Sequence, residues 1–271
     1  MKNDSAAQES VKDSTAIKCL GEWFGTFMFI TVGLSSVAVL VLGMSDINYP
    51  WMAACWGVAI TLAIYVVGSI SGAHMNPAVT IALAAFGGFD GKKVLPYILA
   101  QILGGFCAAV LVYILFGTNI LAYESANNMV RGVTEGLGSG GIFVTAAAEH
   151  VTMMHAFLNE AFLTFVLVLV IFATTDAGNG SAPTAGIPAV AIGASVTFGG
   201  IALGPLTGFA MNPARDLGPR LFLFFNGWGN NAWGSNYYGL IIPIFATIAG
   251  GLLAGLFYKK VIKKYLVGLD S

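Results

Sequence analysis

The octapeptide GAHMNPAV occupies residues 72–79, and the related octapeptide GFAMNPAR occupies residues 208–215. Both contain the triplet Asn-Pro-Ala. Asn is a favoured helix N-cap residue, and Pro is favoured at the first helical position, where its missing N–H costs nothing. Each triplet therefore predicts the start of a helix. Each also follows a long apolar run, so both helices are expected to begin at membrane depth.

The composition indicates an integral membrane protein. Hydrophobic residues make up 57% of the 271 positions, charged residues only 9%, and the mean hydropathy is +0.81. Soluble domains carry about 25% charged residues, so this chain has too few of them to cover a water-exposed surface. The net charge of −1 argues against nucleic acid as a partner. The three cysteines lack metal-ligand spacing, and we expect neither a metal nor a cofactor.

Six apolar stretches are long enough to cross a hydrocarbon core of about 30 Å, which takes about 20 residues. They cover roughly residues 19–42, 51–70, 94–116, 155–175, 187–206 and 238–258. The segments 77–86 and 213–225, which follow the two triplets, are too short to cross and are predicted to be re-entrant half-helices. Residues 117–154 are expected to form an extramembrane loop with a short helix around 142–150.

Lysine and arginine determine the predicted orientation. If the chain crosses the membrane six times, nine of the twelve lie on the same side of it: Lys2, Lys12, Lys18, Lys92, Lys93, Lys259, Lys260, Lys263 and Lys264. The opposite loops contain Arg131 alone. By the positive-inside rule, both termini are predicted to be cytoplasmic. We expect a disordered tail over residues 1–18, one membrane domain over 19–264 and a short tail over 265–271.

The two halves of the domain, 19–116 and 155–264, repeat. Asn212 lies 136 positions after Asn76 (212 − 76). Each half contributes three spans, an odd number, so the second half must be inverted relative to the first. The half-helices would then enter from opposite faces and direct their positive N-terminal ends at each other near the midplane.

The backbone before each triplet, at residues 71–75 and 207–211, cannot be helical throughout. At membrane depth, non-helical backbone is tolerated only where protein or water in a cavity forms hydrogen bonds with its N–H and C=O groups. The sequence therefore predicts a pore whose wall consists partly of exposed carbonyl groups.

Several features together are typical of one family: two Asn-Pro-Ala boxes, an Arg directly after the second, the inverted repeat, and a Glu in spans one and four. Residues 18–264 resemble the aquaporin family, also called major intrinsic proteins. The strings SGAHMNPAVT at 71–80 and GPLTGFAMNPARD at 204–216 resemble its bacterial glycerol facilitators in particular. The resemblance implies an all-α membrane protein with six transmembrane helices and two re-entrant half-helices in an inverted three-plus-three repeat. It also implies a pore in every protomer, a homotetramer and a place in the cell membrane.

The resemblance further assigns roles to single residues. It places the selectivity filter at Trp56, Gly200, Phe209 and Arg215. Water-selective members usually carry Phe and His at the first two of these positions, whereas an aromatic corner beside a permanently charged Arg suits a small polyol. The other implied roles are those of central donors (Asn76, Asn212), pore-lining carbonyls (Gly72, Ala73, His74, Gly208, Phe209, Ala210) and structural support (Glu22, Glu160, Asp216).

The function implied by the resemblance is a passive channel, not an enzyme. It would conduct glycerol and other small neutral solutes, with some water, and would exclude ions and protons. Two alternatives stay open at this point. One is a water-selective channel. The other is a coupled secondary transporter, which also contains broken helices in an inverted repeat and would use Glu22 and Glu160 as coupling sites.

Overall fold

The computed structural model describes residues 14–134 and 137–266, and within them all regular secondary structure is helical. Six helical segments in this part of the chain are long and apolar enough to cross a membrane, as predicted. Five of them are α2 (Thr15–Val41), α3 (Tyr49–Ser71), α5 (Val94–Ala126), α6 (Met153–Thr175) and α7 (Ile187–Thr207). The sixth consists of α9 (Tyr238–Ile241), α10 (Thr247–Phe257) and α11 (Lys263–Leu266), linked by the π-helical turns Ile242–Ala246 and Tyr258–Ile262.

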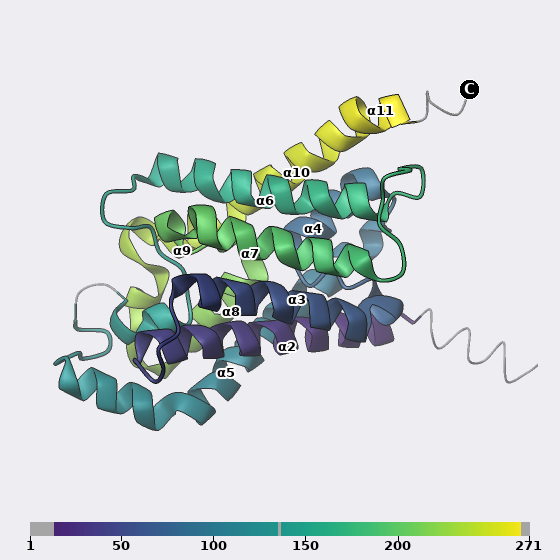
Figure 1. The fold of residues 1–271 in the computed structure, drawn as a ribbon. Coiled ribbons are helices and arrows are strands. Elements are labelled where there is room, and N and C mark those ends of the chain that lie inside the picture. The colour runs from purple at the N-terminus through teal and green to yellow at the C-terminus, as the bar shows by residue number, and fades with distance from the viewer. Residues whose placement is uncertain (1–13, 135–136, 267–271) are drawn as a thin grey trace, which may run out of the picture.

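The two segments after the triplets form the predicted half-helices. α4 spans Pro77–Ala82 and continues as the π-helical turn Leu83–Gly87, whereas α8 spans Pro213–Leu223 and continues as the turn Phe224–Trp228. Figure 1 shows α4 towards the end of the bundle where α2 begins and α11 lies, and α8 towards the opposite end. The half-helices therefore enter from opposite ends of the bundle, as an inverted repeat requires.

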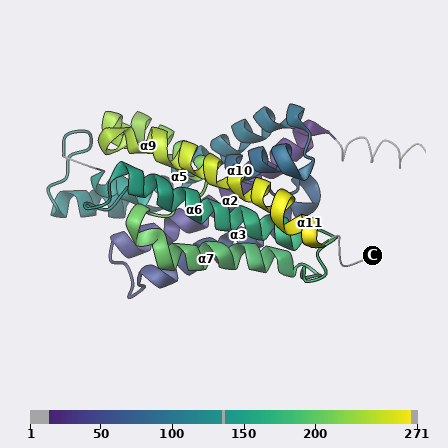
Figure 2. The same cartoon turned by 90° about the horizontal axis from the view of Figure 1, so that it is seen from above.

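Small residues let the spanning helices approach closely, as is usual for helix packing in lipid. α3 crosses α7 at Gly57 and Gly193, where a Cβ on either glycine would clash with the carbonyl oxygen of the other. α6 lies between α7 and α10 in both Figure 1 and Figure 2. The α3–α7 crossing joins the two halves of the chain.

Paired glycines on α5 and α10 hold the half-helices in place. A Cβ on Gly105 of α5 would lie 2.5 Å from the carbonyl oxygen of Ala214 in α8, and a Cβ on Gly251 of α10 would lie 3.1 Å from that of Ala78 in α4. Each half-helix therefore packs its first turn against a spanning helix of the other half. This exchange interlocks the two repeats.

Two expectations about the connection 117–154 were wrong. α5 runs to Ala126, ten residues beyond the predicted end at residue 116, because Ile120 and Glu124 on its last turns are buried against the protein. A helix around residues 142–150 is also absent. In its described residues the connection forms one 3₁₀ turn, Gly138–Ile142, and then runs as irregular backbone into the bundle, where its polar groups bind α8.

Candidate functional site

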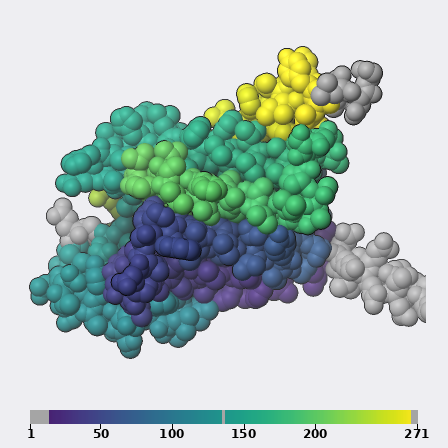
Figure 3. Space-filling view, viewed as in Figure 1, coloured from purple at the N-terminus to yellow at the C-terminus, as the bar shows by residue number. Residues whose placement is uncertain are grey.

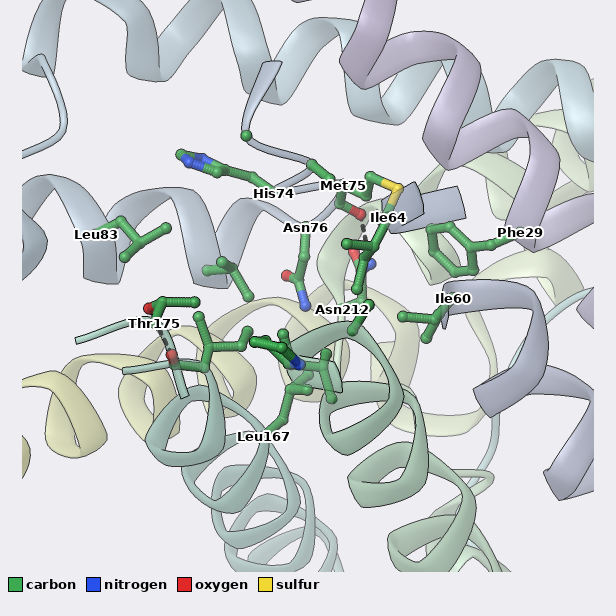
Figure 4. Close-up of a pocket in the computed structure, with 17 residues that line it drawn as sticks. Phe29, Ile60, Ile64, His74, Met75, Asn76, Leu83, Leu167, Thr175 and Asn212 are labelled. Atoms are coloured by element: carbon green, nitrogen blue, oxygen red, sulfur yellow. Dashed lines mark hydrogen bonds between the residues drawn. The ribbon is translucent and has the colours of Figure 1, made fainter. Parts of the chain in front are cut away.

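Asn76 and Asn212 meet at the centre of the bundle and cap their half-helices, as predicted. The Oδ1 atom of each accepts from the backbone N–H two residues ahead, at 2.9 Å in both cases. Asn76 Nδ2 donates to the carbonyl of Met211, and Asn212 Nδ2 donates to that of Met75, both at 2.8 Å. A primary amide has two N–H groups, so each Asn keeps one that is not bonded to any described residue. Figure 4 shows both amides at the edge of one cavity.

The backbone before each triplet turns sharply, at matching positions in the two repeats. Ala73 and Met75 have φ angles of 50°, and Phe209 and Met211 have φ angles of 42° and 53°. These are left-handed conformations that non-glycine residues seldom adopt. After these turns, the carbonyl groups of residues 72–75 and 208–211 accept no helical hydrogen bond.

Two buried carboxylates hold these turns. Glu22 on α2 accepts from the N–H groups of His74 and Met75, at 2.9 and 2.6 Å. Glu160 on α6 accepts from those of Ala210 and Met211, at 2.9 and 2.8 Å. Glu22 also accepts from the side chain of Gln101 at 2.7 Å, and Glu160 accepts from the side chain of Thr207 at 2.6 Å. Each carboxylate therefore receives at least three donors from the protein.

Trp56, Phe209 and Arg215 converge in space, although they lie on three different segments. The guanidinium carbon of Arg215 is 4.3 Å from the ring centre of Trp56. The rings of Trp56 and Phe209 meet edge to face, with centres 6.3 Å apart and planes at 82°. Arg215 Nη1 donates to the carbonyl of Phe143 at 3.1 Å. The three side chains form two aromatic walls and one charged wall around a narrow space.

Gly200 acts on this space only through Phe209. A Cβ at position 200 would lie 3.0 Å from Phe209 Cε2 and 3.2 Å from the Cβ of Ala53. The Phe209 ring occupies the space that a side chain at position 200 would take, so Gly200 determines the position of one aromatic wall.

Three cavities lie in series through the bundle. The first, of about 150 Å³, is lined by residues that include Gly72, Ala73, His74, Asn76 and Asn212. The second, of about 30 Å³, shares both asparagines with the first and adds Trp56, Phe209, Ala210 and Arg215. The third, of about 330 Å³, shares Trp56, Phe209 and Arg215 with the second and includes Gly208. The shared lining residues place these cavities next to one another, and the smallest of the three lies between the asparagines and Arg215.

Asp216 does not pair with Arg215, although the two are adjacent. It forms an ion pair with Arg220, one turn further along α8. Its Oδ2 atom accepts from the backbone N–H and the hydroxyl of Thr145, at 2.8 and 2.7 Å. The guanidinium of Arg215 is therefore free of an acidic partner among the described residues.

A sequence profile described as major intrinsic protein matches residues 9–258. The chain belongs to the major intrinsic protein family. A glycerol uptake facilitator protein of Haemophilus influenzae is 42% identical over 251 residues, which cover 92% of this chain and 95% of that protein. A propanediol uptake facilitator of Citrobacter freundii is 42% identical over 258 residues, covering 94% and 96%.

A solved structure agrees with the assignment. The aquaglyceroporin from Plasmodium falciparum superposes on this major intrinsic protein with a TM-score of 0.82 at 28% sequence identity. The match covers 94% of this chain and 99% of the other. The similarity extends over both repeats.

Several residues of the site in this major intrinsic protein were not found from the sequence. The backbone carbonyls of Met75 and Met211 accept hydrogen bonds from the asparagine amides, and the backbone carbonyl of Phe143 accepts one from Arg215. A carbonyl leaves no mark in the sequence because every residue has one. Gly33, whose Cα packs against the ring of Trp56, was also missed, since glycine is common throughout the chain.

Proposed function

We propose that the chain is a passive channel for glycerol and other small neutral solutes, that it also passes some water, and that it excludes ions and protons. The observation that carries the proposal is the arrangement of Trp56, Phe209 and Arg215 around the narrow end of the central cavity. A polyol has a carbon face and a hydroxyl face. Its C–H groups would pack on the two rings while its hydroxyls bond the guanidinium and nearby carbonyls.

The rest of the path provides further partners. The carbonyls of residues 72–74 and 208–210 form the acceptors of the proposed ladder, and the free N–H groups of Asn76 and Asn212 form the central donors. A pore that replaces each lost hydration bond, without binding tightly, allows rapid flux. Both relatives described above are uptake facilitators for small polyols, which agrees with this chemistry.

Charge exclusion follows from the same parts. A cation would meet Arg215 and then the N-termini of α4 and α8, each carrying about half a positive charge. A water at the centre would accept from both asparagines and donate to neither, which would interrupt a chain of proton transfer. Glu22 and Glu160 are occupied by backbone donors, which favours a passive pore over a coupled transporter.

The location and assembly belong to the same proposal. The lysine pattern supports cytoplasmic termini in a plasma membrane, and the described ends of the chain lie at one end of the bundle in Figure 1. Large apolar side chains such as Ile114 and Phe225 are exposed on the outer surface of the protomer, where lipid or neighbouring protomers of a homotetramer would cover them.

Stopped-flow light scattering on proteoliposomes tests the proposal. Water, glycerol, urea and a small carboxylic acid would be compared in vesicles with and without the protein. We expect glycerol permeability well above that of protein-free vesicles. Glycerol permeability at the protein-free level, with raised water permeability, would instead identify a water-selective channel. Uphill solute accumulation driven by a pH or sodium gradient would identify a coupled transporter.

A further inference from the structure

Arg131 is the one lysine or arginine of the predicted outer loops, and the proposed pore gives it no role. Its guanidinium is nevertheless held from several sides. Nε donates to Glu124 Oε1 at 2.8 Å, and Nη1 donates to Tyr113 Oη at 3.0 Å. The guanidinium carbon lies 4.0 Å from the ring centre of Trp228. A partly buried Arg with this many contacts is expected to hold surrounding segments together.

Glu124 connects this arginine to the 3₁₀ turn Gly138–Ile142. Glu124 is only 6% exposed, and its Oε1 atom also accepts from Ser139 Oγ in that turn, at 2.5 Å. Trp228 packs on the same turn, because a Cβ on Gly140 would lie 2.9 Å from Trp228 Nε1. We call Glu124, Arg131, Ser139 and Trp228 the outer clamp. It ties the end of α5, the 3₁₀ turn and the segment after α8 into one unit.

The turn leads directly to the filter. Phe143 follows it, with its N–H bonded to the carbonyl of Gly140 at 2.9 Å and its ring fully buried, 6.2 Å from that of Trp228. The carbonyl of Phe143 accepts from Arg215 Nη1 at 3.1 Å. Among the described residues this is the one hydrogen bond of the Arg215 guanidinium. The position of the Arg215 guanidinium therefore depends on the position of the Phe143 carbonyl.

We propose that Arg131 and Glu124 are positioning residues of the selectivity filter. They hold the turn that presents the Phe143 carbonyl, and this carbonyl fixes the Arg215 guanidinium beside Trp56. Neither residue lines the central cavity. The inference rests on the proposed function, because it takes Arg215 to be the donor that a passing hydroxyl meets.

Two variants test the outer clamp. Arg131→Met keeps an apolar stem but removes the donors, and it leaves the buried Glu124 carboxylate unpaired, which is destabilising. The double variant Glu124→Gln/Arg131→Met leaves no unpaired charge. We expect the ratio of glycerol to water permeability to fall at least about twofold in both variants. A twofold change corresponds to the lower end of the coupling usually found between a site and residues that act on it indirectly. A displaced guanidinium no longer replaces the hydration of a glycerol hydroxyl, whereas water is small enough to pass.

Controls separate positioning from general loss of structure. Arg131→Lys can keep the bond to Glu124 alone, so it should give an intermediate ratio. Lys93→Met breaks an ion pair with Asp90, 3.9 Å long and unconnected to the filter, and should leave the ratio unchanged. An unchanged ratio in the folded double variant would overturn the inference, as would equal losses of both permeabilities. A wild-type chain without glycerol permeability would refute the proposed function and the inference with it.

Discussion

At the scale of single residues, the proposed filter depends on close packing behind the rings that line it. Gly200 has no side chain to offer a solute, yet the Phe209 ring rests against it. Gly199, one position earlier, faces the end of the Leu163 side chain instead, with a Cβ 3.0 Å from Leu163 Cδ2. The two adjacent glycines therefore allow a matched comparison.

Gly200→Ala is expected to lower glycerol permeability about fivefold more than water permeability. The added methyl group pushes Phe209 into the passage, and one methyl group in a close-fitting site is worth about 1 kcal/mol or more. Gly199→Ala should change the ratio little, because a leucine side chain can move aside. Stopped-flow measurements on the two variants make the comparison, and equal ratios would show that the Phe209 wall does not select.

Residue-level prediction from the sequence worked where side chains carry the chemistry. The caps at Asn76 and Asn212 follow from Asn before Pro, a local rule with a local cause. Backbone acceptors outside the segments before the two triplets could not be found in this way. The carbonyl of Phe143 reaches Arg215 across 72 positions of sequence, and only the folded path of the connection brings it there.

At the scale of elements, close crossings rather than long apolar runs determine the packing. Apolar length predicted all six spans, but it placed the end of α5 ten residues early, because Glu124 near that end is polar and yet buried. Hydropathy cannot anticipate a buried carboxylate whose partners, Arg131 and Ser139, come later in the chain.

Gly57→Ala should destabilise the α3–α7 crossing by about 1–3 kcal/mol, the usual cost of overpacking, because the new Cβ meets the carbonyl of Gly193. Gly68→Ala on the same helix is the control, since its Cβ would come no nearer than 3.8 Å to Ile64 Cγ2. Thermal unfolding in detergent reports the difference. Equal unfolding temperatures in the two variants would contradict the role of this crossing.

A second prediction concerns the end of the last span, which projects from the body in Figure 3. Lys263 Nζ lies 2.9 Å from Asp176 at the end of α6, and its hydrogen bond lowers the pKa of Asp176 below the ordinary value of 3.8. The stabilisation is therefore present above about pH 4 and is lost as the pH falls through the lowered pKa.

Asp176→Asn should accordingly lower the unfolding temperature by about 1–3 °C at pH 7, since a partly exposed ion pair is worth at most about 1 kcal/mol. The difference from wild type should shrink as the pH falls below 4. Asp46→Asn, at an exposed residue without an ion pair among the described residues, is the control. A difference that grows on acidification would contradict the assignment.

At the scale of the whole molecule, the proposed path has its proposed charge barrier at the centre, where the two repeats meet. Vesicles that contain the protein should therefore leak protons no faster than protein-free vesicles, although their glycerol permeability is raised. A pH-sensitive dye inside the vesicles, with a protonophore as the positive control, makes the measurement. Proton flux that increases with the amount of protein would refute a barrier built from Asn76, Asn212 and the ends of α4 and α8.

The reciprocal bonds of Asn76 and Asn212 also bear on how the chain is made. The amide of Asn76 needs the carbonyl of Met211, which is 135 positions later in the chain. At synthesis rates of about 5–20 residues per second, this acceptor emerges on the order of ten seconds after its donor. The first half must therefore wait in the translocon or bilayer with its re-entrant segment unfinished. Biogenesis of this protein should end in one late joining step, at which both halves become complete together.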